Sequence, residues 1–144
     1  MILLEKTGIV TPKDDKTNIF FDFAVPSGIK KIVIDYNYSP KTVENKADAI
    51  ALIEKKIKQY GAGGAPEDYL PVKNLITLSL NDENGYRGAA HRQADTQHHE
   101  ICENYAAAGF IKGKIESGKW QIALNVHCCA CDVHYNLKIT GAAE

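Results

Sequence analysis

Hydrophobic and polar positions alternate along two stretches in the first third of this chain of 144 residues. Each stretch places every second side chain on one face, which is the period of a β-strand with one buried side. The turn-forming residues Pro26-Ser27-Gly28 separate the two stretches. The sequence therefore predicts an antiparallel hairpin with one hydrophobic face, formed by Ile19, Phe21, Phe23 and Val25 on one strand and by Ile32, Ile34, Tyr36 and Tyr38 on the other.

The hydrophobic period changes to three and four residues after Asn45, which is typical of an amphipathic helix. Asn45 and Asp48 have the spacing of an N-terminal cap and its partner, and Gly61 is a stop signal. A loop rich in glycine and proline follows. We therefore expect one helix over about 45–60, whose packed face consists of Ile50, Ile53, Ile57 and Tyr60, with Ala47 beneath them.

Strand-like alternation resumes after the helix. Ile76, Leu78 and Leu80 share one face, and the turn-rich run NDENG follows them. Two further strands have the clearest pattern. Their core-facing residues are Trp120, Ile122, Leu124, Val126 and Cys128 on the first, and Val133, Tyr135, Leu137 and Ile139 on the second.

The register of these last two strands leads to a metal-site hypothesis. If they form a hairpin closed over Cys129 to Asp132, Val126 pairs with Tyr135 and every core residue meets a core residue. The same register puts His127 across from His134 on the outer face, with Cβ atoms about 5 Å apart. These two imidazoles can then share a metal ion with Cys129 as a third ligand, or they are simply solvent-facing neighbours.

Many short strands, one helix and no strand–helix–strand alternation predict a mainly β protein. The expected fold is an antiparallel β-sandwich, of jelly-roll or pre-peptidase C-terminal type, with the helix as an insertion. The chain has no internal repeat and no internal boundary, so residues 1–144 are expected to form one domain. Its 44% hydrophobic and 24% charged residues are ordinary for a folded globular protein.

The net charge and the absence of a leader pattern argue against nucleic-acid and membrane partners. The net charge of −1 provides no global field for a nucleic acid or an anionic membrane. No basic leader with a long apolar run is present, and no apolar stretch has the length of a membrane span. A cytoplasmic protein with no nucleic-acid or membrane partner is expected. The four cysteines, at 102, 128, 129 and 131, then favour free thiols, and their spacing does not match a structural zinc site.

The stretch GYRGAAHRQADTQHHEI, residues 85–101, concentrates arginine and histidine. Guanidinium groups match phosphate or carboxylate, and histidine adds switchable donors, so these side chains are candidates for an anion or sugar site. A metal held by His91, His98 and Asp95 is an alternative. In the third interpretation Arg87 holds its own loop by bonding carbonyl groups. The candidate ligand-binding residues are Arg87, His91, Arg92, His98 and His99.

Four segments of the chain, taken in order, resemble the β-sandwich domain that precedes the catalytic domain in a group of PHP-type metal-dependent phosphoesterases. They are FFDFAVPSGIKKIVIDYNYSP, NLITLSLNDENGYRGAAHR, AAAGFIKGKIESGKWQIALNVH and VHYNLKITG. The most specific marks are Tyr86-Arg87-Gly88 with His91-Arg92, then Ala107-x-Gly109-Phe110 followed by Gly113, then Gly118-x-Trp120. The closing pattern is also similar to the bacterial pre-peptidase C-terminal domain.

The resemblance implies an accessory role and not a catalytic one. The catalytic domain of those phosphoesterases opens with a Gly-Asp-Leu-His-x-His metal motif, and no His-x-His occurs in these 144 residues. We therefore expect a non-catalytic module without a cofactor, which binds a small anionic or sugar ligand or a separately encoded PHP-type phosphoesterase. The alternative is a small metal-binding protein or hydrolase that uses the segment 91–99 or the histidines at 127 and 134.

Overall fold

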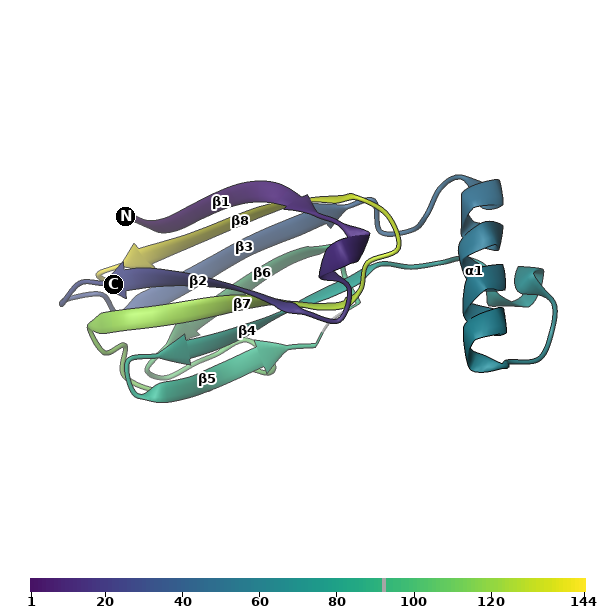
Figure 1. Ribbon diagram of the computed structural model, residues 1–144. Helices are drawn as coiled ribbons and strands as arrows, with labels where there is room; N and C mark the ends of the chain where they lie inside the picture. Colours follow the sequence, from purple (N-terminus) through teal and green to yellow (C-terminus); the bar gives the residue numbers. More distant parts are fainter. Residues whose placement is uncertain (92) are drawn as a thin grey trace.

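The computed structural model describes residues 1–91 and 93–144. Within these residues the chain forms two antiparallel sheets of four strands each, packed face to face (Figure 1). The first sheet has the order β1 (Ile2–Val10), β8 (Val133–Ala142), β3 (Lys31–Ser39), β6 (Thr96–Cys102). The second has the order β2 (Asn18–Val25), β7 (Gly118–Cys128), β4 (Leu75–Asp82), β5 (Gly85–Ala90).

This strand order is that of a jelly roll. Each connection between successive strands crosses from one sheet to the other, apart from the hairpin between β4 and β5. Eight strands interleaved in this way make the two Greek keys of that fold. The predicted β-sandwich is confirmed, and of the two types expected the strand order is that of the jelly roll.

The two hairpins predicted from the sequence, one between β2 and β3 and one between β7 and β8, are wrong. β2 pairs with β7, and β3 pairs with β6 and β8, so the strands flanking Pro26 lie in different sheets. β7 and β8 are likewise in opposite sheets. The prediction failed because alternation identifies the buried face of a strand but not its neighbour: hydrophobic faces match equally well side by side or across the two layers.

The core lies between the sheets and consists of the faces that the alternation predicted. Trp120, Ile122 and Leu124 on β7 have no exposed surface, and Tyr36 on β3 is also buried. Cys128, at the end of the predicted β7 face, is only partly buried. Burying these faces together removes apolar surface from water, which is the main driving force for folding.

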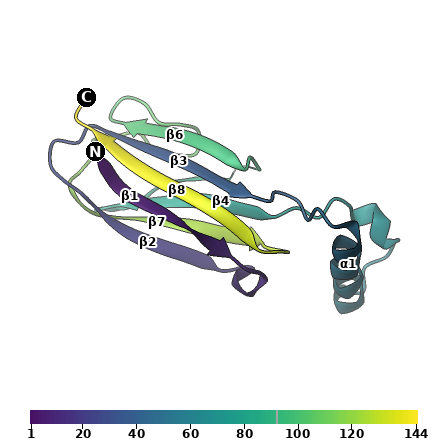
Figure 2. The same cartoon turned by 90° about the horizontal axis from the view of Figure 1, so that it is seen from above.

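The inserted helix is confirmed as α1 (Lys46–Tyr60). The Asn45 side chain accepts a hydrogen bond from the Asp48 amide at 3.0 Å, as predicted, and Gly61 ends the helix in the left-handed conformation with φ 66°. α1 does not lie on a sheet but projects beyond one end of the sandwich (Figures 1 and 2). Its packed face is therefore narrower than predicted, with only Ala49 and Ile53 buried and Tyr60 64% exposed.

A short stem attaches this insertion to the sandwich. Backbone hydrogen bonds join Val43 to Val72 and Asn74 to Lys41. The fully buried Asn74 side chain donates to Pro40 O at 2.9 Å and accepts from the Ala130 amide at 2.8 Å. Asn74 thus connects the stem to the loop between β7 and β8. The short 3-10 helix η2 (Pro66–Tyr69) packs against α1.

The jelly-roll order sorts the connections between the two ends of the sandwich. We call one the helix end: it gathers the β1–β2 connection with 3-10 helix η1 (Pro12–Asp14), the α1 insertion, the β5–β6 connection and the β7–β8 connection. The other, which we call the terminal end, gathers residues 26–30, 83–84 and 103–117 together with both termini (Figure 2). No helix in the described ranges is long and apolar enough to cross a membrane.

Candidate ligand-binding site

Arg87, the first candidate for anion binding, holds its own surroundings together at the terminal end. Its guanidinium donates to Ile111 O at 2.7 Å, Gly113 O at 2.6 Å and Lys114 O at 3.1 Å. It also forms an ion pair with Asp82 at 2.9 Å. The residue is only 5% exposed. The loop-holding interpretation of Arg87 is therefore the one that the structure supports.

The other marks of the resemblance at this end form one packed unit with Arg87. The guanidinium lies 5.6 Å from the centre of the Trp120 ring, and the Trp120 indole donates to Glu116 O at 2.9 Å. A Cβ at Gly109 would lie 2.1 Å from Ala89 O, so this loop can approach β5 only with glycine at this position. These residues fix the long β6–β7 loop.

His98 and His99 point to opposite faces of β6, as neighbouring residues of a strand must. His98 is exposed on the outer face of the first sheet and contacts Asp35 at 2.6 Å and Glu100 at 3.4 Å. Hydrogen bonds to these two carboxylates raise the pKa of His98 above its ordinary value of 6.5. His99 is buried in the core, with Gln97 as a partner at 2.8 Å and the Phe110 ring 5.1 Å away. The two do not form one site.

His91 and His127 come together, although the sequence pointed to other partners for both. Their ring centres are 6.2 Å apart in an edge-on arrangement, and the Thr77 hydroxyl lies 2.9 Å from His127 Nε2. His134 lies on β8, where it is opposite Ile9 and Ser39. The predicted pairing of His127 with His134 is therefore wrong, because their strands belong to different sheets. Arg92 lies outside the described residues.

Metal-ligating side chains do not gather in the described residues: no three of their His, Cys, Asp or Glu side chains form a group that could hold a metal ion. The Cys129 thiol contacts the backbone oxygens of Val10 and Cys131, at 3.6 and 3.1 Å. Burial, followed by the neighbouring Cys131, raises the pKa of the Cys129 thiol to about 12. This thiol is therefore protonated at neutral pH.

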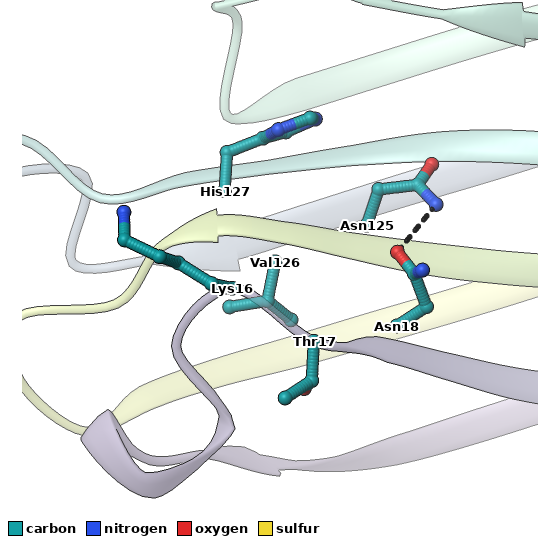
Figure 3. Close-up of a pocket in the computed structure, with 6 residues that line it drawn as sticks. All are labelled: Lys16, Thr17, Asn18, Asn125, Val126 and His127. Carbon is teal, nitrogen blue, oxygen red and sulfur yellow. Dashed lines mark hydrogen bonds between the residues drawn. The ribbon is translucent and has the colours of Figure 1, made fainter.

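A polar pocket of about 270 Å³ opens beside His127 at the helix end (Figure 3). The lining comes from the turn before β2, from β2 and from β7. In Figure 3 the Lys16 and His127 side chains lie on the same side of the ribbon, whereas Thr17 and Val126 point to the other. Its residues are Lys16, Thr17, Asn18, Asn125, Val126 and His127.

The backbone of the turn explains how Lys16 reaches this pocket. Lys16 has φ 62°, and it is the one residue other than glycine with positive φ in the described ranges. This left-handed conformation costs an ordinary residue about 1–2 kcal/mol. The turn is held on both sides, because the Thr17 hydroxyl donates to Asp14 O at 2.6 Å and Thr17 O accepts from the Val126 amide at 2.9 Å. Lys16 is thus held in a strained conformation beside the pocket.

Two asparagine amides line the part of the pocket farther from Lys16. Asn18 and Asn125 are directly opposite each other on β2 and β7, and the Asn125 amide donates to Asn18 Oδ1 at 3.0 Å (Figure 3). The other atom of that group, Asn125 Oδ1, is buried and has no hydrogen-bond partner among the described residues. A buried acceptor of this kind is costly unless a donor reaches it.

Sequence reasoning identified two histidines of this region, His91 and His127, but not the rest of the pocket. Asn18 and Asn125 stand at outward positions of predicted strands, where a single polar residue is unremarkable. A signal did exist in the turn: Lys16 follows Asp14-Asp15, at a position where glycine or asparagine would suit a left-handed residue. Only the pairing of β2 with β7 brings the two amides together.

No protein-family model matches this chain, and a search of curated proteins gives no significant match. The strand order and the helix alone define the class of this protein, which is a jelly-roll β-sandwich with one inserted helix. The resemblance to the accessory domain of PHP-type phosphoesterases stays a prediction.

Proposed function

We propose that this β-sandwich is a non-catalytic binding module whose ligand is a small hydroxylated anion, such as a phosphorylated or acidic sugar. The ligand occupies the polar pocket beside His127. The observation that carries the proposal is the convergence of an ammonium, two amides and an imidazole around one cavity from two segments of the chain, residues 16–18 and 125–127.

The charges of the lining favour an anion with hydroxyl groups. Lys16 contributes a positive charge, and no carboxylate of residues 1–91 or 93–144 lines the pocket. Amide groups such as those of Asn18 and Asn125 both donate and accept hydrogen bonds, which matches the hydroxyl groups of a sugar. Asn125 Oδ1 adds an acceptor without a partner in the described part of the chain. A strained residue such as Lys16 often marks a functional site.

The resemblance supports a binding role beside an enzyme, because the similar domains accompany a catalytic domain and do not contain its metal motif. An association with a separately encoded phosphoesterase is part of this proposal. Arg87, a candidate ligand-binding residue from the sequence, has a different role in this proposal. It stabilises the module, and the ligand is bound at the opposite end of the sandwich.

Isothermal titration calorimetry of the full chain tests the pocket. Glucose 6-phosphate is the probe, and glucose and inorganic phosphate are its two halves. We expect the sugar phosphate to bind more tightly than either half, because the ammonium and the amides act together. His127→Gln should weaken this binding about tenfold, which corresponds to the loss of one charge-assisted hydrogen bond.

His134→Gln is the matched control, since His134 is also exposed on an outer face but lies in the other sheet. It should leave the affinity unchanged. The proposal fails if neither the sugar phosphate nor its halves bind, or if both substitutions weaken binding equally. Stoichiometric zinc in protein purified without a His tag, lost on His91→Ala or His127→Ala, would favour the metal-binding alternative.

A further inference from the structure

A second, larger cavity lies at the helix end and does not belong to the polar pocket. It is a groove of about 540 Å³ between α1, η2, the turn around Asp15 and the loop at Cys128 to Ala130. Its hydrophobic wall consists of Leu52, Ile53, Ile57, Tyr60, Tyr69 and Val72. A volume of this size falls in the range of small-molecule sites, roughly 300–1,000 Å³.

Apolar side chains of the groove stay partly open to solvent. Tyr60 is 64% and Tyr69 is 44% exposed, and Ile57 is only half-buried. The insertion that carries them is attached through its stem and is not covered by either sheet. Contiguous apolar surface with a polar rim is typical of a binding site, whereas single exposed apolar residues are not.

The rim of the groove carries a local excess of positive charge. Lys55 and Lys56 of α1 and Lys16 of the turn line the groove, whereas Asp15 is its one acidic lining residue among those that the structure describes. The Asp15 carboxylate already accepts a hydrogen bond from the Cys129 amide at 2.7 Å. The chain as a whole has a net charge of −1, so this excess is a property of the groove.

Two of these lysines, Lys16 and Lys56, come from different segments of the chain and line the groove together with Cys128. The Lys56 ammonium lies 5.6 Å from the centre of the Tyr60 ring, which places it over the apolar wall. Burial, followed by the nearby Asp15 carboxylate, raises the pKa of the Cys128 thiol, and the ammonium groups of Lys16, Lys56 and Lys41 partly oppose that rise. The groove thus combines an apolar wall along α1 with a rim that carries more lysines than carboxylates.

We propose that this groove binds a free amphipathic carboxylate, the acyl or aromatic body lying along α1 and the carboxylate lying between Lys16 and Lys56. Charge complementarity selects this ligand over a neutral or cationic amphiphile. The site is separate from the polar pocket in all but Lys16, so each proposal can fail without the other.

The test uses decanoate as the probe, below its micelle-forming concentration, with the full chain. Decan-1-ol and decyltrimethylammonium have the same tail with a neutral and a cationic head. We expect calorimetry to show one site for decanoate and at least tenfold weaker binding of the other two. Decanoate should also slow the alkylation of Cys128 by iodoacetamide, which mass spectrometry can assign to that residue.

Two matched pairs of variants on α1 locate the site. Lys56→Gln should weaken decanoate binding about fivefold, the upper range for one partly exposed ion pair. Lys58→Gln, on the same helix but not lining the groove, should leave it unchanged. Ile57→Asn should weaken binding more than Ile50→Asn, because Ile57 lines the groove and Ile50 does not, although both are half-buried.

Circular dichroism and the unliganded Tm show that each variant is folded before it is titrated. Equal binding of all three amphiphiles, equal effects within each pair, or unaltered Cys128 alkylation would each overturn the proposal. Binding of anionic vesicles without binding of decanoate would also overturn it, because the ligand would then be a membrane surface and not a free carboxylate.

Discussion

The two ends of the sandwich use polar side chains in opposite ways. At the terminal end, the buried Arg87 guanidinium contacts three backbone carbonyl oxygens and the Asp82 carboxylate, and Trp120 lies under it. At the helix end, Lys16 is held in a strained conformation beside a pocket, and Asn125 Oδ1 has no partner in the described residues. The polar groups around Arg87 stabilise the fold, whereas the polar pocket beside His127 includes an acceptor without a partner in the described residues.

This difference shows that a cluster of arginine and histidine in the sequence is not by itself a site. The described residues of this stretch, 85–91 and 93–101, are distributed over both ends, the core and an outer face. Most of the marks that carry the family resemblance lie at the terminal end, where they fix the β6–β7 loop. They therefore report on how the domain folds, and the proposed ligand site lies elsewhere.

Among the variants that test the difference between the two ends, Arg87→Ala should have the largest effect on the free energy of unfolding. It leaves the largely buried Asp82 side chain, which is 10% exposed, and three carbonyl oxygens without their donor, so we expect a loss of about 3–5 kcal/mol in the free energy of unfolding. Urea denaturation followed by Trp120 fluorescence measures it. A loss below about 1 kcal/mol, the value for an exposed ion pair, would contradict a structural role for this end.

Lys16→Gly should separate stability from binding at the helix end. Glycine relieves the left-handed strain of about 1–2 kcal/mol but loses more backbone entropy on folding, roughly 0.5–1 kcal/mol, so the net change is a gain of about 0–1.5 kcal/mol. Glucose 6-phosphate and decanoate should both bind more weakly, because Lys16 lines both cavities. Denaturation and calorimetry on the same sample measure the two effects. A variant that is less stable and binds normally would make Lys16 a structural residue.

His98→Asn should have the smallest effect on the free energy of unfolding. His98 contacts two carboxylates but is exposed, so a small effect would show that the contacts of Arg87 stabilise the terminal end because they are buried, and not because they are numerous. Because the pKa of His98 is raised in the folded state, its contribution is complete below pH 6.5 and disappears as the pH rises through the folded value. Solvent screens this exposed cluster, so we expect about 0.5 kcal/mol or less. Wild-type protein should lose this amount, relative to the variant, between pH 5.5 and pH 8.5. A pH-independent difference would contradict the assignment.

The sequence by itself determined the local features of this protein. Period-two alternation identified the buried faces, for example Ile32 and Ile34 on β3, because side chains of a strand alternate strictly between two faces. The span and caps of α1 followed from Asn45 and Gly61, whose conformational preferences act over a few residues. The mainly β class followed from these elements together.

Only the tertiary structure decided which strands are neighbours, and with that where the candidate sites lie. Hydrophobic faces match any other hydrophobic face, so the pattern could not distinguish a β7–β8 hairpin from strands of opposite sheets. The jelly-roll order then brought His91 to His127, Asn18 to Asn125, and Arg87 to the loop at Gly113. These contacts join residues distant in sequence, and their formation depends on how the whole core packs.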